Sequence, residues 1–212
     1  MESIVKTIIC PKCGKKQNFI MYPSVNVSLD PDLADKYLDG NLSILTCEDC
    51  GFSGIVEYPI LYYDIEKKFS IFFSPDKTDH EAKIPDVLPV HLLPGMCLRL
   101  VHSSDDLREK IFIFRDLLDD RVVEIVKDSI LREMNVRHEA KIPDYLYYAQ
   151  DMFDCENRFL IFVPKKDEKY LGPIKIPFGT YEKIKMLMRG IWDRPIEGYT
   201  VVDKHWVQSA AK

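Results

Sequence analysis

The spacing of apolar residues predicts short strands and one helix in the first third of the chain. Apolar positions alternate in KKFSIFFSP, and the preceding GIVEYPILYYD is rich in strand-forming residues, so we expect a hairpin that turns near Glu66. The segments NFIMYPSVNVS and LSILTC also have the composition of strands. Between them, LDPDLADKYLDG is typical of a short helix that Asp30 or Asp32 caps and Gly40 ends.

Two helices are expected in the middle of the chain. GMCLRLVHSSDDLREKIFIFRD has the pattern of a strand that leads into a helix, whose apolar stripe includes Leu107 and Ile111. LLDDRVVEIVKDSILREM predicts a second helix, because Val122, Val126 and Ile130 recur on one face. The acidic start of this second segment suits the positive end of a helix dipole.

The last third of the chain predicts two strands and a C-terminal helix. YLYYAQDMF and NRFLIFVPK are expected to pair around a turn near Glu156. FGTYEKIKMLMRG comes next as a helix that Thr180 caps and Gly190 ends. The inward face of this helix is expected to consist of Tyr181, Ile184, Leu187 and Met188. The tail after it is expected to add an edge strand.

Four of the six cysteines form two matched pairs near the N-terminus. Each pair has the spacing C-x2-C and a following glycine, and 33 residues separate the pairs. Two such turns can present four thiolates to a tetrahedral metal ion, while the glycine permits a backbone conformation that is costly for other residues. The sequence therefore predicts a structural Zn²⁺ site whose ligands are Cys10, Cys13, Cys47 and Cys50.

Other uses of these cysteines fit the pattern less well. A redox C-x-x-C pair usually caps a helix, but GKKQNF after Cys13 lacks an amphipathic pattern, and a second matched pair would be unexplained. The H-x-E motif of zinc deaminases is absent, and neither His80-Glu81 nor His138-Glu139 is completed to H-E-x-x-H. Iron is the other ion that four thiolates accept. The remaining Cys97 and Cys155 stand alone and are interpreted as small apolar residues.

The pattern as a whole predicts an α+β fold in two parts. Residues 1–74 are expected to form a zinc-ribbon-like β module with a short inserted helix. Four prolines in residues 74–95 exclude a regular helix, so residues 75–95 are interpreted as a proline-rich connector. Residues 96–212 are expected to form a mixed α/β domain with two central helices, antiparallel strands and a C-terminal helix.

The distribution of charge disfavours a nucleic-acid partner. The first 94 residues contain 9 Lys or Arg and 14 Asp or Glu residues, whereas the rest of the chain contains 20 of each. A nucleic-acid binder is expected to carry a basic face. One local candidate remains around the first cysteine pair, where the aromatic residues Phe19 and Tyr22 accompany four lysines. These lysines are Lys6, Lys12, Lys15 and Lys16.

Two further features of the sequence bear on function. No apolar run has the length of a membrane span and the N-terminus lacks the apolar core of a signal peptide, so we expect no membrane association and a cytoplasmic location. The heptapeptide HEAKIPD occurs at both 80–86 and 138–144 with unrelated flanks. It is interpreted as a repeated connector, with two equivalent binding loops or a His80–His138 metal site as the functional alternatives.

Several segments resemble a known family. CPKCG, DPDLADKYLDGNL and CEDCG resemble the N-terminal module of the CpXC family, a prokaryotic group named for its Cys-Pro-any-Cys motif. The stretch RLVHSSDDLREKIFIFRDLLDDRVVEIVKD is similar to the segment that comes after this module in many members. The resemblance implies a metal-binding module with the four cysteines in the ligand positions, and it implies little chemistry beyond that.

The function that fits these observations is that of a zinc-binding, non-enzymatic interaction or regulatory protein with a protein partner. Formation of a homo-oligomer is also compatible with these observations. One alternative is a nucleic-acid-associated regulator that uses the basic first cysteine turn. The other is an enzyme with an unrecognised site in residues 96–212. Its candidate groups are Asp119, Asp120, Arg121, Glu124 and His102.

Overall fold

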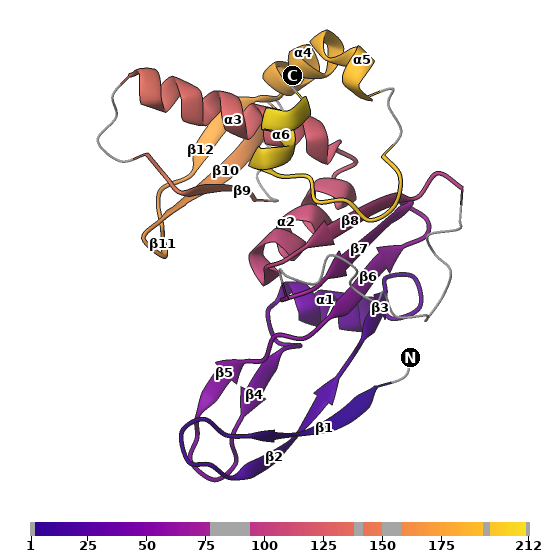
Figure 1. The fold of residues 1–212 in the computed structure, drawn as a ribbon, viewed down its shortest axis with the longest axis vertical. Coiled ribbons are helices and arrows are strands. Elements are labelled where there is room, and N and C mark those ends of the chain that lie inside the picture. Colours follow the sequence, from indigo (N-terminus) through magenta and orange to yellow (C-terminus); the bar gives the residue numbers. More distant parts are fainter. Residues whose placement is uncertain (1–2, 77–93, 138–141, 150–157, 193–195, 211–212) are drawn as a thin grey trace. The chain divides into compact units, whose positions relative to one another are not determined.

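A computed structural model describes residues 3–76, 94–137, 142–149, 158–192 and 196–210. The chain divides into two compact units, residues 1–104 and 105–212. Helices and strands alternate without a regular β-α-β repeat in either unit, so the predicted α+β class is confirmed (Figure 1).

In its described residues, the first unit contains two antiparallel ribbons, a four-stranded sheet and one helix (Figure 1). One ribbon is β1 with β2, and the other is β4 with β5. The sheet has the order β3-β6-β7-β8, in which β6 and β7 are antiparallel and the two outer strands each run parallel to their neighbour. The elements are β1 (Ile4–Ile9), β2 (Lys16–Met21), β3 (Ser24–Asn26), α1 (Pro31–Leu38), β4 (Ile44–Thr46), β5 (Ser53–Ile55), β6 (Ile60–Asp64), β7 (Phe69–Phe73) and β8 (Cys97–Val101).

The two central strands of this sheet form the core of the first unit. Every residue of β6 and β7 is buried, as expected for strands that are covered on both faces. The predicted hairpin between them is confirmed, and the Asp64 side chain closes its turn by accepting the Lys67 N–H at 2.9 Å. Helix α1 places Tyr37 against Tyr62 of the sheet. Asp30 occupies the N-cap of α1, but its side chain makes no capping hydrogen bond.

The second unit combines helices with a four-stranded antiparallel sheet. The strands β9, β11 and β12 all pair with β10, each along a different part of it. Helix α3 contacts both α4 and α6. The elements are α2 (Ser104–Arg115), α3 (Asp120–Val136), β9 (Tyr145–Tyr148), β10 (Phe159–Lys166), β11 (Lys169–Tyr170), β12 (Ile174–Pro177), α4 (Phe178–Leu187), α5 (Arg189–Trp192) and α6 (Lys204–Ala210).

The strand at 97–101 belongs to the first unit, although the proline-rich segment before it suggested a boundary at 75–95. Strand β8 is hydrogen-bonded to β7 over its full length, from Phe69 opposite Cys97 to Phe73 opposite Val101. A strand that completes a sheet cannot be separated from it, so the division of the chain falls after Ser104.

The C-terminal region differs from its prediction in four details. Thr180 lies inside α4, because the helix continues directly from β12 and has Pro177 at its N-cap. Leu187 is 69% exposed, whereas Tyr181 is buried as predicted. Gly190 lies within the short helix α5 instead of ending α4. The tail forms α6, where the Asp203 carboxylate accepts the N–H groups of the first turn, and no edge strand is present among residues 196–210.

Candidate metal centre

The two C-x-x-C pairs occupy equivalent turns of the two ribbons. Cys10 and Cys13 lie in the turn that joins β1 to β2, and Cys47 and Cys50 lie in the turn that joins β4 to β5. The first cysteine of each pair is buried, whereas Cys13 is exposed and Cys50 is half-buried. The turns bring together residues that are 34 and 40 positions apart in the chain.

The backbone of the two turns is closely similar. The Gly14 N–H donates to the Cys10 carbonyl at 2.9 Å, and the Gly51 N–H donates to the Cys47 carbonyl at 3.0 Å. Both glycines have positive φ, at 73° and 66°, and a Cβ at either position would meet no atom within 4 Å. Glycine is therefore required for its left-handed backbone conformation, as the sequence predicted, and not to make space.

The four sulfur atoms have the spacing of a tetrahedral thiolate site. The Cys10 and Cys50 Sγ atoms are 3.7 Å apart, as are those of Cys13 and Cys47, and all four lie within 4.8 Å of one another. A tetrahedral ion with Zn–S bonds of about 2.3 Å sets its sulfur atoms about 3.8 Å apart. A disulfide would need about 2.05 Å, so the cysteines are free thiols at metal-binding distance.

The electrostatics of the cluster favour a bound cation. Burial opposes ionisation of Cys10, but hydrogen bonds from the Cys13 and Lys12 backbone lower its pKa to about 7. At Cys13 the Lys15 backbone favours the thiolate, yet burial and the other three cysteines together raise the pKa to about 12. The cluster thus gains a first thiolate readily and resists further negative charge, which a divalent ion would neutralise.

A polar clamp connects the two cysteine turns beside the sulfur atoms. Asp49, between the second pair of cysteines, forms an ion pair with Lys15 and accepts the Gln17 amide N–H at 2.9 Å. The Gln17 amide oxygen in turn accepts the Glu48 N–H at 3.4 Å. The hydrogen bond to Lys15 is the main cause that holds the Asp49 pKa below its ordinary value. Nothing in the C-x-x-C spacing indicated this clamp, because its members lie on both ribbons.

The local basic cluster is only partly available to a nucleic acid. Lys6, Lys12 and Lys16 are exposed, but Lys15 is engaged by Asp49. Phe19 is 5% exposed, and its ring packs edge-to-face on Tyr58, at a centroid distance of 6.0 Å. Of the two aromatic candidates for base stacking, Phe19 is therefore part of the core, whereas Tyr22 is half-buried.

The candidate catalytic groups of the second half have different local partners. Asp119 caps α3 by accepting the Arg121 N–H at 3.0 Å, and its carboxylate also pairs with the Arg121 guanidinium at 2.7 Å. His102 belongs to the first unit, where its Nδ1 lies 2.9 Å from the Ser74 carbonyl oxygen. Asp120 and Glu124 do come together, because both contact the buried Lys110 of α2.

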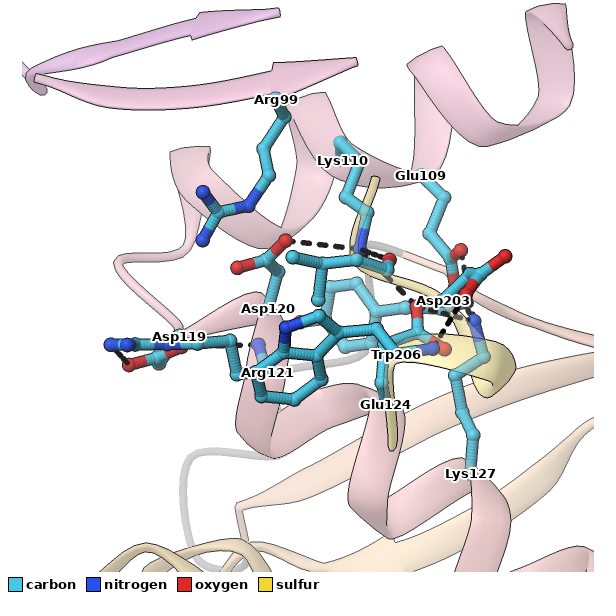
Figure 2. A network of polar contacts seen from close by, with 12 residues as sticks. Arg99, Glu109, Lys110, Asp119, Asp120, Arg121, Glu124, Lys127, Asp203 and Trp206 are labelled. Atoms are coloured by element: carbon cyan, nitrogen blue, oxygen red, sulfur yellow. Dashed lines mark hydrogen bonds and ion pairs between the residues drawn. The ribbon is translucent and has the colours of Figure 1, made fainter. Parts of the chain in front are cut away.

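That lysine is the centre of a buried ion network (Figure 2). Lys110 Nζ lies 3.0 Å from Asp120 and 3.3 Å from Glu124, and it donates to the Val202 carbonyl at 2.7 Å. Lys127 joins the network by pairing with Glu124 at 2.9 Å and with Glu109 at 3.0 Å. The sequence does not indicate these contacts, because each residue occupies an ordinary polar position of an amphipathic helix.

Ionisation within this network depends on burial and charge. Burial would lower the pKa of Lys110, but the attraction of Asp120 and Glu124 raises it. Burial is the main cause that raises the pKa of Glu109 to about 7; Lys127 opposes the rise and Glu124 reinforces it. Since both lysines are saturated by carboxylates, the network has the properties of a structural element.

A cavity of about 260 Å³ lies in the second unit between α2 and the β9–β10–β11 face. Its walls are mainly aromatic and aliphatic, with Asp105, Arg108 and Glu109 as the charged members. None of the five candidate catalytic residues lines it. Of the HEAKIPD copies, 80–86 and 138–141 lie outside the described residues, as does Cys155; Cys97 is half-buried in β8.

The fold and the site define a class: an α+β protein that carries a four-thiol cluster on two C-x-x-C turns in its N-terminal unit. The model of the CpXC protein family matches residues 8–127, which is more than half of the chain and includes all four cysteines. The chain therefore belongs to the CpXC family, as its resemblance indicated. The curated proteins and the solved structures yield no match. In the described part of the chain, no helix is both long and apolar enough to cross a membrane.

Proposed function

We propose that Cys10, Cys13, Cys47 and Cys50 bind one structural Zn²⁺ ion, and that the protein acts in the cytoplasm as a non-enzymatic interaction or regulatory protein. The observation that carries the proposal is the convergence of four free thiols, with two sulfur pairs at 3.7 Å. Four protein thiolates complete a tetrahedron and leave no position for a substrate or a water molecule, which is the property of a structural site.

The size of the cysteine-bearing ribbons supports a structural role for the ion. An isolated two-stranded ribbon is marginally stable in water. The ribbons β1–β2 and β4–β5 each expose aliphatic side chains, with Val5 62% exposed and Ile55 72% exposed. A metal ion that joins their turns supplies the cross-link that a small apolar core does not supply. Zinc is chosen because four cysteine thiolates are a common ligand set of structural zinc sites, and iron is the other ion that this ligand set accepts.

Metal analysis of the purified full chain tests the site. We expect one equivalent of zinc, and we expect Co²⁺ substitution to give the absorption of a tetrahedral thiolate complex. Cys47→Ser should lose most of the metal, whereas the matched control Cys97→Ser, outside the cluster, should retain it. A chain without stoichiometric metal, or equal retention by both variants, would overturn the proposal.

The interaction role has a separate test. The zinc-loaded chain is used as bait, and each captured protein is purified and mixed with it to see whether a complex of fixed stoichiometry forms. Such a complex, formed in moderate salt, supports a protein partner. Binding to nucleic acid that falls steeply with added salt would instead support the alternative that uses the basic first turn.

A further inference from the structure

The ribbon that carries the first cysteine turn has a free strand edge. Among the residues that the structure describes, β1 has β2 as its single strand neighbour. Five of the six β1 residues are exposed and the sixth, Ile8, is half-buried. A strand edge presents unpaired N–H and C=O groups, which an additional strand can satisfy.

The ladder between β1 and β2 shows which backbone groups point outward. The Cys10 N–H donates to the Lys15 carbonyl at 2.9 Å, so the backbone groups of Cys10 point toward β2. Backbone direction alternates along a strand, and the N–H and C=O groups of Val5, Thr7 and Ile9 therefore point to the free edge. These are three donors and three acceptors on alternate residues.

The same three residues carry their side chains on the exposed face of the ribbon. The opposite face is the one that contains Gln17 and Phe19, both of which are buried. On the exposed face Val5 lies opposite Ile20, and their exposed fractions are 62% and 50%; that of Ile9 is 63%. The free edge is therefore bordered by an aliphatic surface, which is unusual for a strand that remains in water.

We infer that β1 pairs antiparallel with β1 of a second copy of this chain, so that two ribbons form one four-stranded sheet. The inference deepens the proposed interaction role and rests on it, because the proposed metal ion holds the turn in which β1 ends. The backbone restricts the register to pairings in which outward-pointing residues lie opposite one another, and the side chains then select among these. When Thr7 lies opposite Thr7 of the second copy, Val5 of each copy lies opposite Ile9 of the other. The outward-pointing residues Val5, Thr7 and Ile9 then all belong to hydrogen-bonded pairs.

Self-complementarity of side chains supports this register and this occupant. Each Val5 then lies between Ile20 of its own ribbon and Ile9 of the second copy, so two rows of β-branched side chains are completed. Shifting one strand by two residues in one direction would place Lys6 directly opposite Lys6 of the second copy, which like charge disfavours. The shift in the other direction would place Val5 opposite Pro11, which has no N–H to donate. In the Thr7-centred register Lys6 lies opposite Ile8 instead.

Light scattering and sedimentation of the zinc-loaded full chain over a concentration series test the inference, with zinc content measured on every sample. We expect a dimer. Thr7→Pro removes an outward N–H without touching the β1–β2 ladder, so it should weaken dimerisation at least about tenfold and keep the metal. Val5→Lys should act likewise, whereas the matched control Ile55→Lys, on an equally exposed aliphatic position of the other ribbon, should leave the dimer unchanged.

The outcomes separate this inference from the proposed function. A zinc-loaded chain that stays monomeric overturns the dimer and leaves the metal site untouched. A dimer that neither Thr7→Pro nor Val5→Lys weakens overturns β1 as its surface. A monomer whose β1 edge binds an extended segment of another protein assigns the edge to a different occupant and also overturns the inference. Absence of zinc from every sample contradicts the proposed function instead.

Discussion

Replacing Lys110 by methionine removes the central cation of the buried network while retaining most of the apolar volume of the side chain. The lysine side chain is 4% exposed, and those of Asp120 and Glu124 are 1% and 5% exposed. Its ammonium group contacts both carboxylates and the Val202 carbonyl. The variant therefore leaves two carboxylates and one carbonyl without this partner in a site from which water is largely excluded.

The expected loss is large because the remaining charges are buried. Removing one partner of a buried ion pair costs about 3–5 kcal/mol, and the lost hydrogen bond to the Val202 carbonyl adds about 1 kcal/mol. A loss of about 4 kcal/mol is a substantial part of the 5–15 kcal/mol that stabilises a typical domain. For a unit of this size it corresponds to a decrease in Tm of about 15 °C or more.

Tryptophan fluorescence during urea unfolding measures this loss in the second unit, because both tryptophans, Trp192 and Trp206, belong to it. The control is Arg137→Met, which breaks an exposed ion pair with Glu133 and should cost about 0.5 kcal/mol or less. A loss below about 1 kcal/mol for Lys110→Met would refute the reasoning, since it would show that solvent reaches the carboxylates.

Neutralising the two carboxylates in Lys110→Met provides an internal check, because their unpaired buried charge is the expected cause of the loss. Adding Asp120→Asn and Glu124→Gln to the variant should recover stability at pH 7, because neutral amides carry no charge that must be paired.

Three further predictions concern both units. Gln17→Ala removes the hydrogen bonds of Gln17 to Asp49 and Glu48 but keeps the Lys15–Asp49 ion pair, so zinc affinity, measured by competition with a chromophoric chelator, should fall about tenfold; an unchanged affinity would exclude a positioning role for Gln17. Gly51→Ala forces a side chain into a backbone with φ of 66° and should weaken zinc binding by about 1–2 kcal/mol in the same assay; retention of full affinity would show that the turn relaxes at little cost. Because burial raises the folded-state pKa of Glu109 from 4.5 to about 7, the second unit should lose up to about 3 kcal/mol of stability as pH rises through that window, and Glu109→Gln should flatten the slope. Parallel pH profiles of stability for the unmodified chain and Glu109→Gln would contradict the assignment of this slope to Glu109.

The grouping of the four cysteines could be predicted from the sequence, because their pattern is local and duplicated. Each C-x-x-C-G turn specifies its own backbone, and a second copy makes coincidence improbable, so the positions of all four sulfur atoms could be inferred from spacing alone. The helix over residues 120–136 was similarly accessible, since Val122, Val126 and Ile130 mark its buried face and all three are buried. The helix signal acts within one element, and the cysteine signal acts within each of two matched turns.

Most of the structural features that the sequence did not indicate depend on contacts between helices and strands. Thr180 has the chemistry of a helix cap, but β12 leads into α4 without a break, so the cap position falls earlier. Tyr181 is buried as predicted, yet its hydroxyl accepts the Asp119 N–H at 2.9 Å, a partner that no helical pattern indicates. Strand β8 was assigned to the wrong side of the connector because prolines mark where a chain is irregular, not which sheet the next strand joins.

The buried ions show why such contacts escape sequence patterns. Glu109, Lys110 and Lys127 occupy polar positions of two amphipathic helices, and polar positions predict exposure because water is the usual partner of a charge. Here the partner is a charge on the facing helix, 14 or 18 residues away. A hydrophobic pattern records the preference of each residue separately, so it is identical for a charge that faces water and for a charge that is buried against a partner helix. Only the packing of α2 against α3 distinguishes the buried charge from the exposed one, so ion networks of this kind become predictable once the pairing of helices is known.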